Sequence, residues 1–187
     1  MEKIKMIFFT IFFASCSLTG QTQEVLRTGL IRAQLTLSPG TFLNTDESLV
    51  YLHGTLEAYT DSKISLTGEG FLQVGQLGSE QSSISQNHSV FFGFHYHFTR
   101  SNHDLYMGIQ PGLSFTRLNP QEETMEAQTG YNPVFSAAVG YNYYVGRFFH
   151  FFVQSRLILG NHMVDRPYNL AELRLSAGLG FNLNVLR

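Results

Sequence analysis

The chain has 187 residues, enough for one domain and a short leader. Only 14% of the residues are charged and the formal net charge is −2, so the sequence lacks the basic stripe of a nucleic-acid-binding protein. It also lacks an apolar run of the roughly 18 residues that a transmembrane helix requires. Glycine (17), phenylalanine (17) and tyrosine (9) are abundant, which favours strands and turns over helices.

The N-terminus has the order of segments found in a secretory leader. Lys3 and Lys5 precede a short apolar core, residues 6–14, which small and polar residues follow. We therefore expect residues 1–20 to be a signal peptide and residues 25–187 to form the mature domain.

The only cysteine, Cys16, leaves two processing routes open. Residues 13–16 resemble a lipobox, which would make Cys16 the site of cleavage and acylation, although Phe13 stands where an aliphatic residue is usual. The other route is ordinary signal-peptidase cleavage a few residues later, for example before Gln21. In either case the mature domain has no disulfide.

Beyond the leader, apolar and polar residues alternate along eight segments. The clearest is 171–186, whose odd positions are apolar and whose even positions as far as Asn184 are polar or glycine. Side chains of a strand point alternately to its two faces, so each segment predicts a strand with one apolar face. Pro111 predicts a bulge in the fifth strand. The predicted strands are 27–37, 48–60, 63–75, 88–99, 104–117, 132–145, 148–160 and 171–186.

The connections between these strands alternate between long and short. The long ones are polar loops, at 38–47, 76–87, 118–131 and 161–169. Transmembrane barrels have short periplasmic turns and longer extracellular loops, and their even strand number places both termini on the periplasmic side. The pattern therefore predicts an all-β fold, an eight-stranded antiparallel up-and-down transmembrane β-barrel.

A soluble barrel of the lipocalin type has the same period with its apolar face inside. Three features favour the membrane barrel. The polar face carries no lysine except Lys63, at a strand end, and the apolar residues are too uniformly large for a narrow interior. Lys63, Arg100 and Arg147 would lie together at the periplasmic rim, with aromatic residues placed for an interfacial girdle.

The leader, the eight long strands, the loop asymmetry and the amphipathic last strand resemble the small OmpA/OmpX-type outer-membrane barrels. The resemblance covers nearly all of the mature chain and implies a place in the bacterial outer membrane. Members of that family usually end in an aromatic residue, whereas Phe181 lies six residues before the end of this chain.

The predicted interior carries six charged residues, three of each sign. An eight-stranded barrel has just enough room for side chains to fill it, and buried charges must be paired. We therefore expect a structural polar plug rather than an ion-selective pore, which would show an excess of one sign. The six residues are Arg32, Glu57, Glu69, Arg156, Glu172 and Arg174.

His53, His95, His97 and His150 also face the predicted interior, the last three toward the periplasmic end. Imidazoles suit Zn, Cu or Ni, and a narrow lumen could bring these three together. The alternative is that they form hydrogen bonds within the plug. Because the pattern predicts no carboxylate at their level, we expect no metal and no other cofactor.

Some small outer-membrane barrels are lipid-modifying enzymes, which need histidine near serine or an acid at the outer rim. His88 with Ser89, and His162 with Asp165, would lie at that rim. Any set of loops offers similar pairs, so we expect no enzymatic activity.

The expected function is that of a structural outer-membrane barrel or an accessory subunit of an envelope complex. The expected partners are outer-membrane lipid and an envelope protein complex, and no nucleic acid. Gly54, Gly68 and Gly70 on the lipid-facing side of two adjacent strands would permit close approach of another membrane element. A small-solute or ion pore is the alternative, and a lipid-modifying enzyme is the third.

Overall fold

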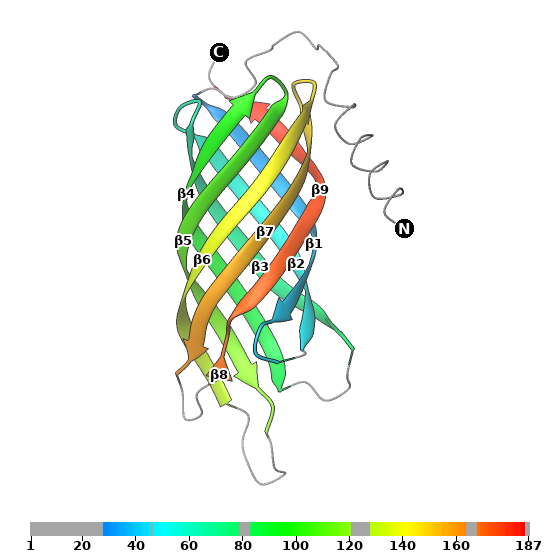
Figure 1. The fold of residues 1–187 in the computed structure, drawn as a ribbon, viewed down its shortest axis with the longest axis vertical. Helices are drawn as coiled ribbons and strands as arrows, with labels where there is room; N and C mark the ends of the chain where they lie inside the picture. Colours follow the sequence, from blue (N-terminus) through cyan, green and yellow to red (C-terminus); the bar gives the residue numbers. More distant parts are fainter. Residues whose placement is uncertain (1–27, 46, 79–82, 121–127, 164–167, 186–187) are drawn as a thin grey trace, which may run out of the picture.

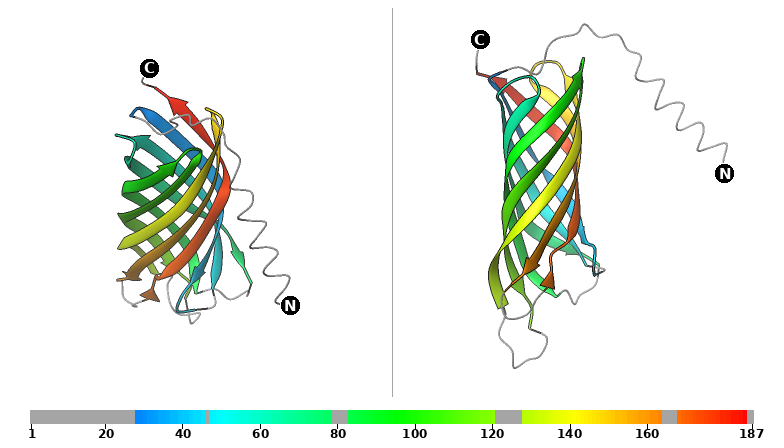
Figure 2. Two further views of the ribbon diagram at one scale, coloured as in Figure 1. Left: turned by 45° about the horizontal axis from the view of Figure 1, so that its top comes forward. Right: turned by 60° about the vertical axis from the view of Figure 1, so that its left-hand side comes forward.

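The computed structural model describes residues 28–45, 47–78, 83–120, 128–163 and 168–185 as a closed antiparallel β-barrel (Figures 1 and 2). Neighbouring strands follow the order β6-β5-β4-β3-β2-β1-β9-β7, and pairing of β6 with β7 closes the ring. The two-residue β8 pairs only with the end of β7. The strands are β1 (Leu30–Phe42), β2 (Ser48–Tyr59), β3 (Ile64–Leu77), β4 (Ile84–Arg100), β5 (His103–Leu118), β6 (Gln128–Val145), β7 (Phe149–His162), β8 (Tyr168–Asn169) and β9 (Glu172–Asn184).

The predicted fold class is confirmed: eight long strands form an up-and-down barrel. The predicted leader, residues 1–20, and Cys16 lie outside the described residues. Among the residues that the structure describes, no helix has the length and apolar character needed to cross a membrane.

The alternation of side chains places the apolar residues on the outer wall. Along β4, Val90, Phe92 and Phe94 are 57–60% exposed, whereas His95 and His97 are 2% exposed and lie inside. A soluble barrel would show the opposite arrangement. The outer wall is therefore suited to hydrocarbon, and the interior holds many polar side chains.

The two ends of the barrel are distinct. The end that we call the terminal end holds Gly29, Val185 and the short turns between β2 and β3, β4 and β5, and β6 and β7 (Figure 1). There the Val185 amide donates to the Gly29 carbonyl at 3.0 Å. The opposite end, which we call the loop end, holds the longer connections, so the predicted asymmetry of the connections is present.

Several strands run further toward the loop end than the sequence predicts. Residues 38–41, predicted as part of a loop, belong to β1 and pair with β2 from Ser38↔Tyr51 to Thr41↔Ser48. The predicted loop 118–131 is shorter for the same reason, because Leu118 pairs with Gln128. Turn-forming residue types such as Pro39 and Gly40 signal a loop, but pairing with a neighbouring strand overrides that local preference.

The bulge predicted at Pro111 is wrong. Pro111 pairs with Phe135 in a continuous β5–β6 ladder, and on the other side the β4–β5 register is the same before and after it (Phe91↔Gly112, Phe94↔Ile109). The proline lacks an N–H and so interrupts that ladder without shifting it. Register shifts occur instead between Val50 and Tyr51 and between Ile84 and Gln86.

The contact between β1 and β9 is interrupted in the middle. Strand pairing stops after Gln34↔Gly180 and resumes at Gly40↔Arg174. In the gap the hydroxyls of Thr36 and Ser38 donate to carbonyls of β9, each at 2.7 Å. Pro39 lies in this stretch and has no N–H to donate, so side chains replace part of the ladder.

Candidate functional site

The candidate site is the lumen, where the six predicted charged residues are buried. Glu57, Glu69 and Glu172 are 0–4% exposed, and Arg32, Arg156 and Arg174 are each 1% exposed. Alternation brings them inside, because each occupies the polar face of its strand. They form three connected groups along the barrel axis.

The central group surrounds Glu69 on β3. Its carboxylate forms an ion pair with Arg156 of β7 and accepts hydrogen bonds from Gln110 (3.2 Å) and Gln154 (3.0 Å). The ring of His53 lies with Nε2 3.0 Å from the same carboxylate and stacks on Phe71 with ring centroids 4.0 Å apart. The charge of Glu69 is thus neutralised and hydrogen-bonded, as a buried charge requires.

The group nearer the loop end pairs Arg174 with Glu172, two residues apart on β9. The guanidinium lies 2.7 Å from the Glu172 carboxylate and donates to Ser89 Oγ at 2.6 Å. It also lies over the ring of Tyr51, 3.8 Å from the centroid, a cation–π arrangement. Asn87 donates to the Tyr51 hydroxyl at 3.0 Å and so links the pair to β4.

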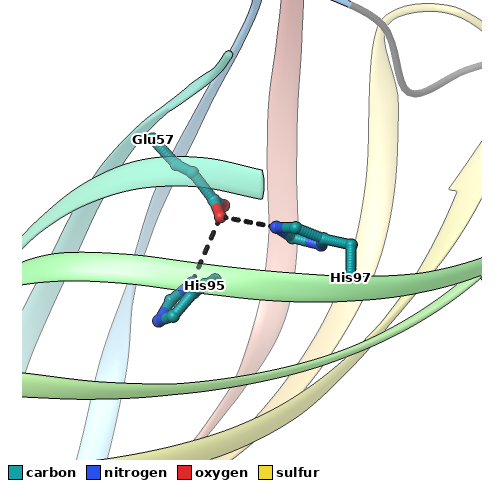
Figure 3. Close-up of side chains that lie close together, drawn as sticks. All are labelled: Glu57, His95 and His97. Carbon is teal, nitrogen blue, oxygen red and sulfur yellow. Dashed lines mark hydrogen bonds and ion pairs between the residues drawn. The ribbon is translucent and has the colours of Figure 1, made fainter. Parts of the chain in front are cut away.

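The group nearer the terminal end contains Glu57, His95 and His97 (Figure 3). Glu57 Oε1 lies 3.1 Å from His95 Nδ1 and 3.2 Å from His97 Nε2. The Glu57 carboxylate also forms an ion pair with Arg32. The other ring nitrogen of His97 lies 3.0 Å from Asp104 of β5. Two expectations are therefore wrong: a carboxylate does lie at the level of the histidines, and the lumen does not hold equal numbers of each charge.

Asp104 is the functional residue that the sequence reasoning missed. It is 0% exposed and lies on the same face of β5 as Tyr106 and Gln110. Strand alternation could have found it, because it stands two residues before Tyr106. With Asp104 included, the described lumen holds four carboxylates and three guanidinium groups.

His150 is not part of the histidine group. Its Nε2 lies 2.8 Å from Gln34 Nε2, and its ring fills the space left by Gly180, where a Cβ atom would come within 2.1 Å of it. The prediction that His95, His97 and His150 meet is thus correct only for the first two.

Glycines on the inner face provide room for the large side chains of the lumen. A Cβ atom at Gly108 would lie 2.4 Å from His95, and one at Gly140 would lie 2.2 Å from Tyr106. Both contacts are far shorter than van der Waals distance, so these positions admit the rings only because they carry no side chain.

Both ends of the lumen are closed. At the loop end ten buried side chains form a cluster that we call the apolar plug. At the terminal end Leu30, Tyr59 and Tyr144 pack together over the histidine group, and the two tyrosine hydroxyls lie 3.3 Å apart. The apolar plug comprises Phe42, Leu49, Tyr51, Phe71, Ile84, Phe91, Leu118, Val134, Ile158 and Leu170.

Of the residues considered for enzymatic activity at the outer rim, His88 and Ser89 do not meet. His88 is half-buried on the outer wall, where its ring stacks on Phe115, whereas Ser89 is buried inside beside Arg174. The two side chains thus lie on opposite faces of β4. His162 is buried beside Asn132, and Asp165 lies outside the described residues.

The three outward glycines lie side by side as expected. Gly54 pairs with Gly70, and Gly68 pairs with Leu56, on the adjacent strands β2 and β3. A Cβ atom at Gly70 would meet nothing within 4 Å. The wall is therefore flat at this place, which we call the glycine patch.

Comparison with solved structures shows the same fold in several outer-membrane proteins. The outer membrane protein OprG from Pseudomonas aeruginosa matches with a TM-score of 0.62 and 10% identity, over 87% of this chain and 99% of that chain. The N-terminal β-barrel domain of P. aeruginosa OprF matches with 0.59 and 11%, over 83% and 98%. Neisserial surface protein A matches with 0.59 and 14%, over 83% and 96%.

No protein-family profile matches the sequence, and no curated protein is significantly similar to it. At identities of 10–14% the structural matches concern the fold alone. The chain is an eight-stranded antiparallel barrel with the fold of the small bacterial outer-membrane proteins of the OmpA/OmpX type.

Proposed function

We propose that this protein is a non-conducting, non-enzymatic barrel of the bacterial outer membrane. It serves there as a structural protein or as an accessory subunit of an envelope complex. The exposed aliphatic and aromatic side chains of the outer wall support the location, since a large exposed apolar surface marks a contact with membrane or another protein. By the rule for barrels with short periplasmic turns, the terminal end faces the periplasm.

The observation that carries the non-conducting role is the filled lumen. Three arginines inside it are each 1% exposed, and each lies against a carboxylate or hydrogen-bond acceptors. A conducting pore keeps its charged lining in contact with water, whereas the charged side chains of this lumen are buried. Here the apolar plug closes the loop end and the tyrosines close the terminal end.

Planar-bilayer recording of the purified full chain tests this proposal. We expect no discrete conductance steps, whereas stable unitary steps in the wild-type protein would contradict the non-conducting role. Loss of a lipid modification in a His162→Ala strain, with normal amounts of folded barrel, would contradict the non-enzymatic role.

The accessory role is tested by extracting native membranes in mild detergent, followed by sizing and identification of co-purifying proteins. A large side chain introduced at the glycine patch should break a contact made there, because small residues permit close approach of another membrane element. We expect Gly68→Phe to release the barrel from its assembly. The matched control is Leu72→Phe, at an outward position of β3 that is 53% exposed and already bulky. A wild-type barrel that elutes alone would contradict the accessory role. An assembly that stays intact in Gly68→Phe would show that the glycine patch is not the contact site.

A further inference from the structure

The terminal-end group of the lumen brings three metal-ligand atoms together. His95 Nδ1 and His97 Nε2 lie 3.1 and 3.2 Å from the same oxygen of Glu57, and the three ligand atoms all lie within 4.8 Å of one another (Figure 3). In a tetrahedral site with bonds of about 2.0–2.2 Å, neighbouring ligand atoms are separated by roughly 3.3–3.6 Å. The two distances to Glu57 are thus close to the spacing of a metal site, and the two nitrogens lie within 4.8 Å of each other.

Hydrogen-bond accounting shows that these atoms need a cation or an additional proton between them. His97 Nδ1 lies 3.0–3.1 Å from both oxygens of Asp104, which can only accept, so this nitrogen carries the hydrogen. In the neutral imidazole, Nε2 then presents a lone pair to the carboxylate oxygen of Glu57, and two acceptors would repel each other. The Ser65 hydroxyl lies beside both atoms but has one hydrogen to give.

The charges of the lumen also indicate that a positive charge is needed near this cluster. Among the described residues it holds the carboxylates of four acids, one more than its guanidinium groups. Near the cluster, Arg32 lies against both Glu57 and Asp104, at 3.6 Å from the latter. One arginine therefore compensates two carboxylates, and a buried excess negative charge requires a bound cation or a proton.

The groups around the ligands are arranged as an outer shell. The distal nitrogen of a metal-binding histidine usually donates to a carboxylate, which fixes the ring and its tautomer. His97 has Asp104 in this position, whereas His95 Nε2 has no hydrogen-bond partner and lies 3.6 Å from Glu69. Asp104 is held in turn by Asn142 at 2.9 Å.

We propose that Glu57, His95 and His97 bind one divalent transition-metal ion of the Zn²⁺ class, with Ser65 or a water beside the open position. Two imidazoles and one carboxylate suit Zn²⁺, Cu²⁺ or Ni²⁺, whereas Mg²⁺ and Ca²⁺ prefer oxygen ligands throughout. The ion ties β2 to β4 and, through Asp104, to β5. Because the cluster is buried beneath Tyr59 and Tyr144, the ion enters as the barrel forms. This goes beyond the proposed structural role, since it gives the lumen a specific ligand.

The test is to refold the untagged full chain with and without Zn²⁺, remove free metal by chelation, and measure bound metal by mass spectrometry. We expect one equivalent of Zn²⁺ per folded wild-type barrel and none in His95→Gln or His97→Gln. His53→Gln and His150→Gln are matched controls, because both replace a buried histidine outside the cluster, and they should keep the full equivalent. Asp104→Asn should retain the site with roughly 10–100-fold lower affinity.

A second measurement uses only the wild-type protein, so it remains informative if the variants fail to fold. X-ray absorption of the Zn²⁺-refolded wild-type barrel should show two imidazole nitrogens and at least one oxygen around the metal. A wild-type barrel refolded in excess Zn²⁺ that retains no metal would overturn the proposal and assign the missing charge to a proton on His97. Equal metal content in the wild-type protein and a folded His97→Gln variant would overturn it as well.

Discussion

The two ends of the lumen are closed by different kinds of interaction. At the loop end the closure is the apolar plug, in which residues such as Leu49 and Phe71 are fully buried against one another. At the terminal end, Arg32, Glu57 and Asp104 form a charged group. Two tyrosines pack over this group and complete the closure. Apolar packing loses free energy in proportion to the volume removed, whereas a charge network loses most when one member is left without its partner. The two ends should therefore differ in how they respond to substitution.

The largest effect is expected at the terminal end. Arg32→Met keeps much of the side-chain volume but leaves Glu57 and Asp104 without their guanidinium partner. We expect the free energy of unfolding to fall by about 3–5 kcal/mol, the usual cost of removing one partner of a buried ion pair. Denaturant unfolding of the barrel in lipid vesicles measures this loss.

The control is the double variant Arg32→Met with Glu57→Gln, which also removes one of the stranded charges. It should recover part of the lost stability, because the two substitutions act on one ion pair and are not additive. Additive losses would show that the charge network does not hold the terminal end.

The sequence predicts some features of the two ends and not others. The apolar-out, polar-in alternation was readable along every long strand, and with it the burial of Arg32 or Arg174. The loop-end extension of β1 through Pro39 was not readable, because local residue types there signal a turn and only the pairing with Val50 reveals a strand.

The meeting of Glu57 with His95 depends on strand stagger, which the sequence does not contain. Glu57 pairs with Thr67 of β3, and Thr67 pairs with Gly93 of β4. His95, two residues beyond Gly93, reaches the carboxylate because the strands are tilted and side chains converge across the narrow lumen. The alternation within one strand predicts whether a residue faces the lumen or the outer wall, but not its position along the barrel axis.

A smaller effect is expected from the apolar plug. Leu49→Ala removes three carbons from a fully buried side chain, and we expect a loss of about 2–5 kcal/mol, with Ile158→Val as a milder change of about 0.5–1.5 kcal/mol. Graded losses that follow the removed volume would support the contrast with the terminal end. Planar-bilayer recording of Leu49→Ala should still show no conductance, because Arg174 and Glu172 fill the next layer.

The smallest effect concerns the β2–β3 turn at the terminal end. The Asp61 carboxylate accepts hydrogen bonds from the backbone amides of Lys63 (2.6 Å) and Ile64 (2.8 Å), and these bonds lower the pKa of Asp61 below its ordinary value. Because the pKa is lower in the folded chain than in the unfolded one, the stabilisation is complete above the unfolded pKa and is lost as the pH falls through the folded value.

Amide hydrogen exchange measures this turn directly. Protection of the Lys63 and Ile64 amides should be high near pH 6 and should decrease in strong acid. In Asp61→Ala it should be low at both pH values, because alanine offers no acceptor. Asp61→Asn keeps an acceptor oxygen without the titrating group, so its protection should hardly change with pH. Amides at the loop end of the same hairpin, where Ser48 pairs with Leu77, provide the comparison, since Asp61 does not reach them. An equal loss of protection at both ends of the hairpin on acidification would show that the turn carboxylate is not the cause, and that the ends of this barrel are less independent than their chemistry implies.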